Sequence, residues 1–355
     1  MDSLVEELPE VDIFVGTANY RELPELIKDF MNNHSKIAIK NEINKRDFTK
    51  KRVLTTPYHY AYLKIAEGCN NNCTYCAIPK IRGKFTSRPM DEITSEAKDI
   101  IEKYGVKELN LVAQDITRYG KDLYGELKLV ELIGELEKLD CSWIRLLYCY
   151  PELVTDELIS KIKNSQKVVK YIDIPMQHAS DNILKRMNRH VRQQFLQNLI
   201  DKLRAQIPNI VIRTTFIVGF PGETEQDFEI LYNFVQKNAF DKCGFFAYSR
   251  EDGTPAYDFE NQVDEDIKQQ RVSMLYELQE EIMAEKSNAM IGKIVDVMYE
   301  QVDFDSQCFV GRMAEDAPEI DRVVYFTSSE PVDIGGMYKI KITEKIGLDL
   351  KGELV

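Results

Sequence analysis

Three cysteines, Cys69, Cys73 and Cys76, lie within eight residues of one another. They directly follow an apolar run, residues 60–66, that has the pattern of a β-strand. Thiolates this close together on one loop can bind three irons of a single iron–sulfur cluster. The fourth iron would then have no protein ligand and could bind a small chelating molecule. The spacing therefore predicts a cluster site at the end of a strand.

Other roles for these cysteines fit the sequence less well. A structural zinc site takes four ligands, usually from two Cys-x-x-Cys pairs, but only one such pair is present and no histidine is close by. A disulfide framework is typical of small secreted domains rather than of a large chain. The remaining cysteines, Cys141, Cys149, Cys243 and Cys308, are scattered and are expected to be core residues rather than ligands.

The elements that must position this loop alternate between strand and helix from residue 60 to about residue 257. Strands are expected at 60–66, 109–113, 143–148, 171–174, 211–218 and 243–248. Helices are expected at 91–104, 127–139, 155–162, 180–206 and 224–237. This alternation predicts an α/β fold, in which a parallel sheet of six strands curls into a partial TIM-like (βα)6 barrel. In such barrels the chemistry lies on the loops that follow the strands, which is where the cysteines are.

Polar residues lie at or near the ends of other predicted strands. Gln114 closes the second strand, Gln177 and His178 close the fourth, and Arg213 lies within the fifth. Each is a candidate to bind a polar ligand group, and each could instead be a satisfied structural group; for His178 the two interpretations have equal weight. Gly219, in the turn after the fifth strand, would let the backbone approach a flat ligand, although an ordinary strand-to-helix turn explains the same residues.

The rest of the chain divides into flanking segments around a core at residues 59–260. Residues 1–35 contain one strand and one amphipathic helix, too little to bury a core alone, and residues 36–58 have the composition of a linker. Residues 261–285 are expected to form a connecting helix. In residues 286–355, short alternating strands at 294–297, 323–326 and 338–342 predict a small antiparallel β-barrel of the oligonucleotide-binding type.

Composition limits the class of protein. The chain has 355 residues and a formal net charge of −13, which disfavours nonspecific binding to nucleic acid and favours basic partners. It contains neither an apolar run long enough to cross a membrane nor a signal-peptide pattern at residues 1–7. With seven cysteines and no export signal, a cytoplasmic location is expected.

The cysteine motif after a first strand resembles the cluster loop of the radical S-adenosylmethionine (SAM) enzymes. The resemblance implies one [4Fe–4S] cluster on Cys69, Cys73 and Cys76, with an open iron that binds SAM. It also implies that Tyr75 packs on the adenine of SAM and that Gly219 and its neighbours contact the adenosine. The candidates for the other polar groups of SAM are Gln114, Gln177 and Arg213.

Further stretches resemble the methylthiotransferases within that superfamily: residues 66–83, 87–89, 111–115 with 119–120, and 217–223, followed by a tail similar to their TRAM domain. Members add a methylthio group either to a tRNA adenosine (MiaB type) or to the β-carbon of an aspartate in small-subunit ribosomal protein twelve (RimO type). Residues 145–151 and 311–321 resemble the RimO type. The implied reaction also needs a second SAM, an electron donor and a source of sulfur.

The charge of the tail supports the same choice. Residues 286–355 contain eight basic and thirteen acidic residues, a net charge of −5. An RNA-binding surface would be basic, whereas an acidic one attracts a basic ribosomal protein, although a merely solvated acidic surface is also consistent with these numbers. The alternatives are a tRNA methylthiotransferase and a non-catalytic fragment that only binds the ribosomal protein.

The chain departs from the family pattern at its start. Family members carry an N-terminal domain in which three further cysteines hold a second [4Fe–4S] cluster, but no cysteine precedes Cys69 here. Residues 7–12 and 15–17 resemble only the last part of that domain. We therefore expect residues 1–35 to be a remnant of an N-terminally truncated domain, and the second cluster to occur only in a longer protein.

Overall fold

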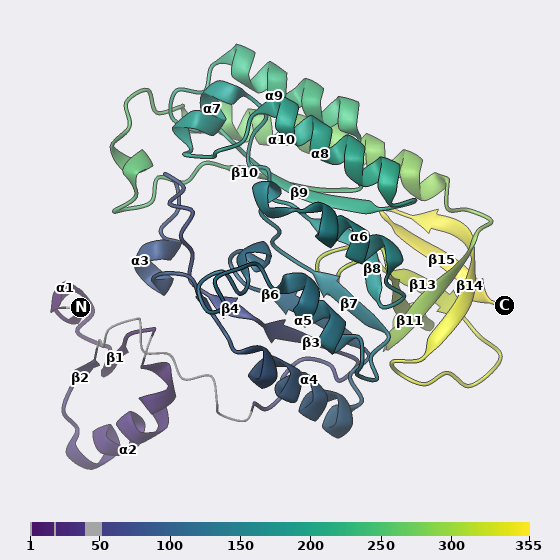
Figure 1. Cartoon of the computed structure of the whole chain (residues 1–355), viewed down its shortest axis with the longest axis horizontal. Helices are drawn as coiled ribbons and strands as arrows, with labels where there is room; N and C mark the ends of the chain where they lie inside the picture. Colours follow the sequence, from purple (N-terminus) through teal and green to yellow (C-terminus); the bar gives the residue numbers. More distant parts are fainter. Residues whose placement is uncertain (1, 18, 40–51) are drawn as a thin grey trace.

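A computed structural model describes residues 2–17, 19–39 and 52–355 of the chain. Its centre is a sheet of six parallel strands in the order β10-β9-β8-β7-β6-β3 (Figure 1). The strands are β3 (Tyr60–Lys64), β6 (Glu108–Val112), β7 (Trp143–Leu146), β8 (Val168–Asp173), β9 (Val211–Val218) and β10 (Lys242–Ala247). All six correspond to strands expected from the sequence, and each lies beside its neighbour in chain order. The partial (βα)6 barrel is thus confirmed.

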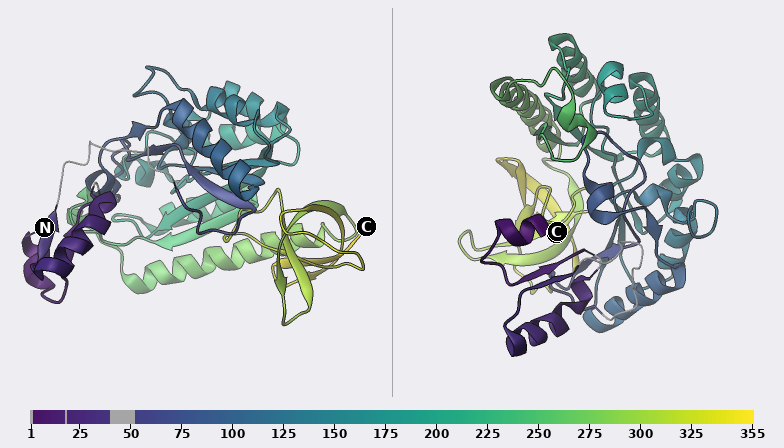
Figure 2. Two further views of the ribbon diagram at one scale, coloured as in Figure 1. Left: turned by 90° about the horizontal axis from the view of Figure 1, so that it is seen from below. Right: turned by 90° about the vertical axis from the view of Figure 1, so that its left-hand side faces the viewer.

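Helices cover the outer face of this curved sheet and form an arc around it in the right-hand view of Figure 2. They are α4 (Met90–Tyr104), α5 (Leu129–Leu136), α6 (Asp156–Asn164), α7 (Asp181–Arg186), α8 (Gln193–Gln206) and α9 (Glu225–Asn238). In α4, Ile93, Ala97, Ile100 and Ile101 form a buried stripe at helical spacing. This stripe packs in one core with strand residues such as Leu63.

One expected helix is in fact two. The stretch 180–206 breaks between α7 and α8, and Asn188 has a positive φ of 56° in the break. Asparagine tolerates this left-handed conformation better than most residues. The break brings residues 186–189 toward the cysteine loop, which we define as residues 68–77.

Short elements complete the core. They are the strands β4 (Ala66–Glu67) and β5 (Thr86–Ser87), the helix α3 (Ile78–Arg82) and the 3-10 turns η2 (Ile116–Arg118), η3 (Pro151–Leu153) and η4 (Pro255–Asp258). The long helix α10 (Glu265–Asn288) then runs along the sheet to the C-terminal region (Figure 2, left).

The C-terminal region forms a closed barrel, called here the C-terminal barrel, in the order β11-β12-β13-β15-β14. Its strands are β11 (Ile294–Asp303), β12 (Cys308–Met313), β13 (Val324–Thr327), β14 (Met337–Ile346) and β15 (Asp349–Leu354). The predicted barrel is confirmed, but the sequence pattern missed β12 and β15. Neighbouring strands are antiparallel except β13 and β15, which pair in parallel and close the barrel.

The N-terminal region contains α1 (Asp2–Glu7), β1 (Ile13–Val15), η1 (Tyr20–Glu22), α2 (Leu23–Asn33) and β2 (Ile37–Ile39). β1 and β2 pair in parallel, so the expected linker at 36–58 begins with a strand; its residues 40–51 lie outside the described residues. This region lies at the end of the molecule opposite the C-terminal barrel (Figures 1 and 2). No helix among the described residues is long and apolar enough to cross a membrane.

The C-terminal barrel covers the inner face of the sheet near the N-terminal ends of its strands. Its segment 314–321, called here the plug segment, contributes Ala317 to an apolar cluster with Trp143, Tyr171 and Val211 of the sheet. The hydroxyl of Tyr171 donates to Asp321 at 3.0 Å. The sheet is therefore closed at this end, and its C-terminal end remains for ligands.

Ion pairs reinforce this contact. Glu108, at the start of β6, pairs with Arg145 of β7 at 2.7 Å and also with Arg312 of the C-terminal barrel. Arg312 pairs with Glu300 at 2.8 Å. The Glu108, Arg145 and Arg312 side chains are all at most 1% exposed. Charges buried this deeply require partners, so the network specifies how barrel and sheet fit together.

Candidate functional site

A cavity of about 590 Å³ opens at the C-terminal ends of the strands. Seven of the eight site residues expected from the sequence line it: Cys69, Cys73, Tyr75, Cys76, Gln114, Gln177 and Arg213. Gly219 is not among the lining residues. Residues that the sequence analysis did not single out also line the cavity, among them Lys64, Tyr148, Tyr150, Arg189 and Phe246. The structure thus gathers residues of β3, β6, β9 and β10, of the segments that follow β7 and β8, and of the cysteine loop around one space.

The cysteine loop begins at a glycine that no other residue could replace without distortion. Gly68 has φ +79°, and a Cβ on it would lie 2.3 Å from the carbonyl oxygen of Lys84. Its N–H donates to Oε1 of Gln114 at 2.5 Å. Gln114 therefore has a structural function at the entrance of the loop, whether or not it also contacts a ligand.

The other end of the loop is tied to the break between α7 and α8. The Thr74 backbone N–H donates to the Met187 carbonyl at 3.1 Å, and its hydroxyl donates to the Arg186 carbonyl at 2.9 Å. The Asn188 side-chain amide donates to the carbonyl of Asn72 at 2.9 Å. These bonds fix the backbone that carries the three thiols.

The three thiols form a donor set that a cluster could use. Burial raises the pKa of Cys69 and of Cys76, while the backbone N–H groups of Asn71 and Ile78, respectively, oppose this shift. Within the described ranges, no three His, Cys, Asp or Glu side chains converge tightly enough to hold one metal ion. A cluster does not require that convergence, because each thiolate binds its own iron at a separate corner. The donor set of three thiols around an open cavity fits a [4Fe–4S] cluster.

Cys73 lies beside polar side chains that the sequence analysis missed. The Tyr150 hydroxyl is 4.0 Å from Cys73 Sγ, and the Arg189 Nη1 is also 4.0 Å from it. Arg189 follows α7, in a region that the sequence pattern assigned to one continuous helix. No signal in the sequence separates Arg189 from the other basic residues of that region.

Tyr75 lies between the cavity and an apolar cluster. Its side chain packs against the cluster formed by Ile183, Met187, Phe220, Tyr248 and Ala256. Burial raises the pKa of its hydroxyl well above the ordinary tyrosine value. The ring therefore stays neutral and can present a face to a ligand in the cavity.

Two further polar residues of the cavity lining come from β9 and from the segment that follows β8. Arg213 Nη1 donates to Oδ1 of Asp173 at 3.0 Å and is held by it against the cavity wall. Gln177 has a positive φ of 73°, and its backbone bonds to Thr215 and Ile217 continue the pairing of β8 with β9. A non-glycine residue in this conformation is strained and persists where the surrounding structure holds it.

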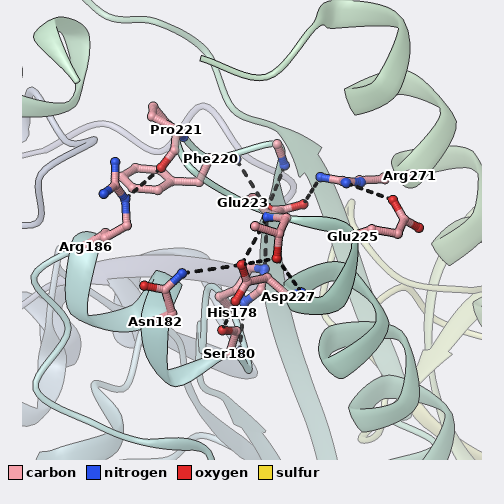
Figure 3. A network of polar contacts seen from close by, with 12 residues as sticks. His178, Ser180, Asn182, Arg186, Phe220, Pro221, Glu223, Glu225, Asp227 and Arg271 are labelled. Atoms are coloured by element: carbon pink, nitrogen blue, oxygen red, sulfur yellow. Dashed lines mark hydrogen bonds and ion pairs between the residues drawn. The ribbon is translucent and has the colours of Figure 1, made fainter. Parts of the chain in front are cut away.

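The turn after β9 is supported by a buried network (Figure 3). Glu223 accepts hydrogen bonds from the N–H groups of Gly219, at 2.8 Å, and Phe220, at 3.3 Å, and pairs with Arg271 of α10 at 2.7 Å. Gly219 has φ +70°, and a Cβ there would lie 2.2 Å from Cγ of Lys268. The shape of the turn thus requires a glycine at position 219. From the sequence, a strand-to-helix turn and contact with a ligand both explained this glycine, and the structure supports the first interpretation.

His178 belongs to the same network rather than to the cavity wall. Its ring is fully buried, Nδ1 accepts from the Ser180 N–H at 2.9 Å, and Nε2 lies 3.4 Å from Glu223 (Figure 3). Ser180 in turn donates to Asp227, whose carboxylate also forms a capping box with Thr224 at the start of α9. For His178 the structure favours the structural interpretation.

The four other cysteines are free thiols outside the cysteine loop. Cys141, Cys149 and Cys308 are buried and Cys243 is partly buried. Burial raises the pKa of Cys149 and of Cys243 well above the ordinary value, which leaves both thiols protonated. Cys149 also lines the cavity.

Comparison with known proteins assigns the two main parts of the chain. A profile of the radical SAM superfamily matches residues 63–235, and one of the TRAM domain matches residues 291–355. "Ribosomal protein uS12 methylthiotransferase RimO" of Acetivibrio thermocellus is 48% identical, across 100% of this chain and 80% of that protein. The proteins of the same name from Desulforamulus reducens and Geotalea uraniireducens are 47% and 45% identical, across 99% and 100% of this chain and 80% and 79% of theirs.

This chain belongs to the RimO family. It is therefore a radical SAM methylthiotransferase, and the C-terminal barrel is its TRAM domain. Membership of the superfamily implies a [4Fe–4S] cluster and SAM as cofactors. The chain spans about 80% of the length of the relatives it matches.

Proposed function

We propose that the chain performs the radical step of uS12 methylthiolation, at a [4Fe–4S] cluster held by Cys69, Cys73 and Cys76. One observation carries this proposal. The three thiols, on a rigid loop, face the same cavity as the polar ends of the neighbouring strands. Held by these three cysteines, a cluster charged by an external electron donor would supply the electron for reductive cleavage of SAM to methionine and a 5′-deoxyadenosyl radical, and that radical would take a hydrogen atom from the β-carbon of the target aspartate.

The residues of the chain bind and orient SAM around this site. Arg213, fixed by Asp173, and Gln177 present polar groups across the cavity from the cysteines, where the carboxylate, amine and ribose hydroxyls of SAM need partners. Tyr75 offers an aromatic face to the adenine. Gly219 lies outside the cavity lining, so its contribution is to shape the turn of β9 through Glu223.

The substrate we propose is an aspartate of ribosomal protein uS12, bound in part by the C-terminal barrel. Some acidic residues of this barrel face the sheet, as Asp316 does in its ion pair with Lys242 at 2.5 Å. The exposed ones still outnumber the exposed lysines. They are Asp296, Asp305, Glu319, Glu330, Asp333, Glu344 and Glu353, against Lys293, Lys339 and Lys341. This excess supports a basic protein as partner. A ribosomal protein as substrate, in turn, supports a cytoplasmic site of action.

Anaerobic reconstitution tests the proposal. We expect one [4Fe–4S] cluster per chain, cleavage of SAM to 5′-deoxyadenosine, and loss of both in Cys73→Ala. The matched control is Cys141→Ala, which removes a buried thiol far from the loop in sequence and should keep iron and cleavage. A colourless protein, or one that holds zinc in place of iron, would contradict the proposal.

A second measurement tests the cluster count and the substrate. Because no cysteine precedes Cys69, we expect the chain to bind no second cluster and to stop before complete methylthiolation. Mass spectrometry of uS12 and of tRNA after incubation with this chain and with a full-length relative would show which is modified. Two clusters on this chain would contradict the expected cluster count. Full turnover by this chain would contradict the expected stop before methylthiolation, and modification of the tRNA would contradict the proposed substrate.

A further inference from the structure

The three cysteines do not have equivalent surroundings. Only Cys73 has a cationic side chain within hydrogen-bond range among the described contacts, since Arg189 Nη1 lies 4.0 Å from its Sγ. The Tyr150 hydroxyl approaches the same sulfur at 4.0 Å. Cys69 instead receives the Asn71 backbone N–H at 3.5 Å. Two side-chain donors from separate elements therefore converge on one sulfur.

Arg189 is held in place with little freedom. Its side chain is buried, with the residue 6% exposed, and Nη2 donates to the carbonyl of Pro175 at 2.8 Å. Its guanidinium carbon lies 4.0 Å from the ring centre of Tyr150, which is a cation–π contact. Its backbone N–H donates to Leu184 at 2.8 Å. The position of the charge is thus set by the segment that follows β8, by the residue before η3 and by α7.

Glu152 contributes a carboxylate near Arg189, but the two groups form no hydrogen bond in the described part of the chain. Glu152 is in the electrostatic surroundings of Arg189, but burial raises the pKa of Glu152 above its usual value. No hydrogen-bond partner for the Glu152 carboxylate oxygens or for Arg189 Nε occurs in the described part of the chain. A buried guanidinium with an unused donor, beside a metal-ligand sulfur, needs an explanation beyond packing.

We propose that Arg189, supported by Tyr150, raises the reduction potential of the cluster by placing a fixed positive charge and a hydrogen-bond donor at the Cys73 sulfur. This inference rests on the proposed cluster. Adding an electron makes the cluster and its thiolates more negative, and a cation in a low-dielectric site stabilises that state more than the oxidised one. Hydrogen bonds to the ligating sulfurs act in the same direction. Arg189 is thus a positioning residue that acts through Cys73.

The test is the midpoint potential of the reconstituted protein, measured by a redox titration followed by electron paramagnetic resonance. Arg189→Met removes the charge and keeps an unbranched side chain, so we expect the reduced state to be disfavoured at least tenfold, a fall of 59 mV for a one-electron couple. Arg189→Lys keeps the charge and should shift the potential less. Tyr150→Phe keeps the ring under the guanidinium, removes the hydroxyl, and should also lower the potential.

Arg204→Met is the matched control. Arg204 lies on α8, where it bonds the carbonyl of Asn238, and its loss should leave the potential unchanged. If Arg189→Met binds a full cluster with an unchanged potential, the inference is wrong. If that variant takes up no iron, the neutral variant Arg189→Gln takes its place, and an unchanged potential in Arg189→Gln overturns the inference. A wild-type chain without a cluster would instead refute the proposed function.

Discussion

Replacing Glu108 with alanine should weaken the attachment of the C-terminal barrel to the sheet. The substitution leaves Arg145, which is 0% exposed, and Arg312, which is 1% exposed, without their shared carboxylate. Removing one partner of a buried ion pair costs about 3–5 kcal/mol. Arg312 keeps Glu300 at 2.8 Å, whereas among the described residues Arg145 keeps the Ala314 carbonyl and the ring of Tyr171. We therefore expect a loss near the lower end, about 3 kcal/mol.

Urea unfolding followed by tryptophan fluorescence measures this loss. Trp143 is the single tryptophan of the chain, is 8% exposed, and lies 5.8 Å from the guanidinium of Arg312, so its emission reports on this contact. The control is Asp296→Ala, which breaks an exposed pair with Lys339 in the same barrel and should cost about 0–1 kcal/mol. If Glu108→Ala is no less stable than Asp296→Ala, the network does not hold the two parts together.

The remaining predictions concern a glycine, a helix cap and acid stability. Gly68→Ala should lose iron binding, because the new Cβ would lie 2.3 Å from the Lys84 carbonyl oxygen. The control is Gly105→Ala: Gly105 also has a positive φ, but no atom lies within 4 Å of the Cβ position. This variant should keep iron and lose about 1–2 kcal/mol of stability on thermal unfolding. Thr224→Ala removes the N-cap of α9 and should cost about 1 kcal/mol in a urea titration; no change would mean that the remaining contacts of Asp227 suffice. Burial raises the pKa of Glu108, but the guanidinium groups of Arg145 and Arg312 outweigh it and hold that pKa below the ordinary value. The Glu108 carboxylate thus contributes to stability above the ordinary glutamate pKa, and this contribution is lost as the pH falls through the lower pKa of the folded state. We therefore expect the difference in unfolding free energy between wild type and Glu108→Gln to shrink at low pH. A difference that does not change with pH would mean that the carboxylate is not ionised.

The sequence predicted the parts of the molecule that depend on local pattern. Alternating strands and helices with apolar stripes, such as Ile93 to Ile101 of α4, follow from periodicity, and so does the position of the cysteines after β3. The end of the α7 helix was missed because the residues between 187 and 192 keep a helix-compatible composition. The break between α7 and α8 forms because Asn188 adopts a left-handed conformation and its side chain donates to the carbonyl of Asn72, which is distant in sequence.

The surroundings of the cysteines could not be predicted for a related reason. Arg189 and Tyr150 reach Cys73 from positions 116 and 77 residues away in sequence. Similarly, the acidic residues of the tail gave a net charge but not which of them face inward, and Asp316 proved to pair with Lys242 of the sheet. Side-chain partners across such separations are set by topology, which periodicity does not encode.

The ion pair between Glu108 and Arg312 joins residues 204 positions apart. During synthesis the six strands of the sheet leave the ribosome well before residue 312 does, so Glu108 and Arg145 first meet without the second guanidinium. Until the last fifth of the chain is made, the inner face of the sheet near the N-terminal ends of its strands is open to water and to chaperones. Slow translation between residues 260 and 312 would prolong that exposure, and the nascent chain would gain protease resistance only after the C-terminal barrel has emerged.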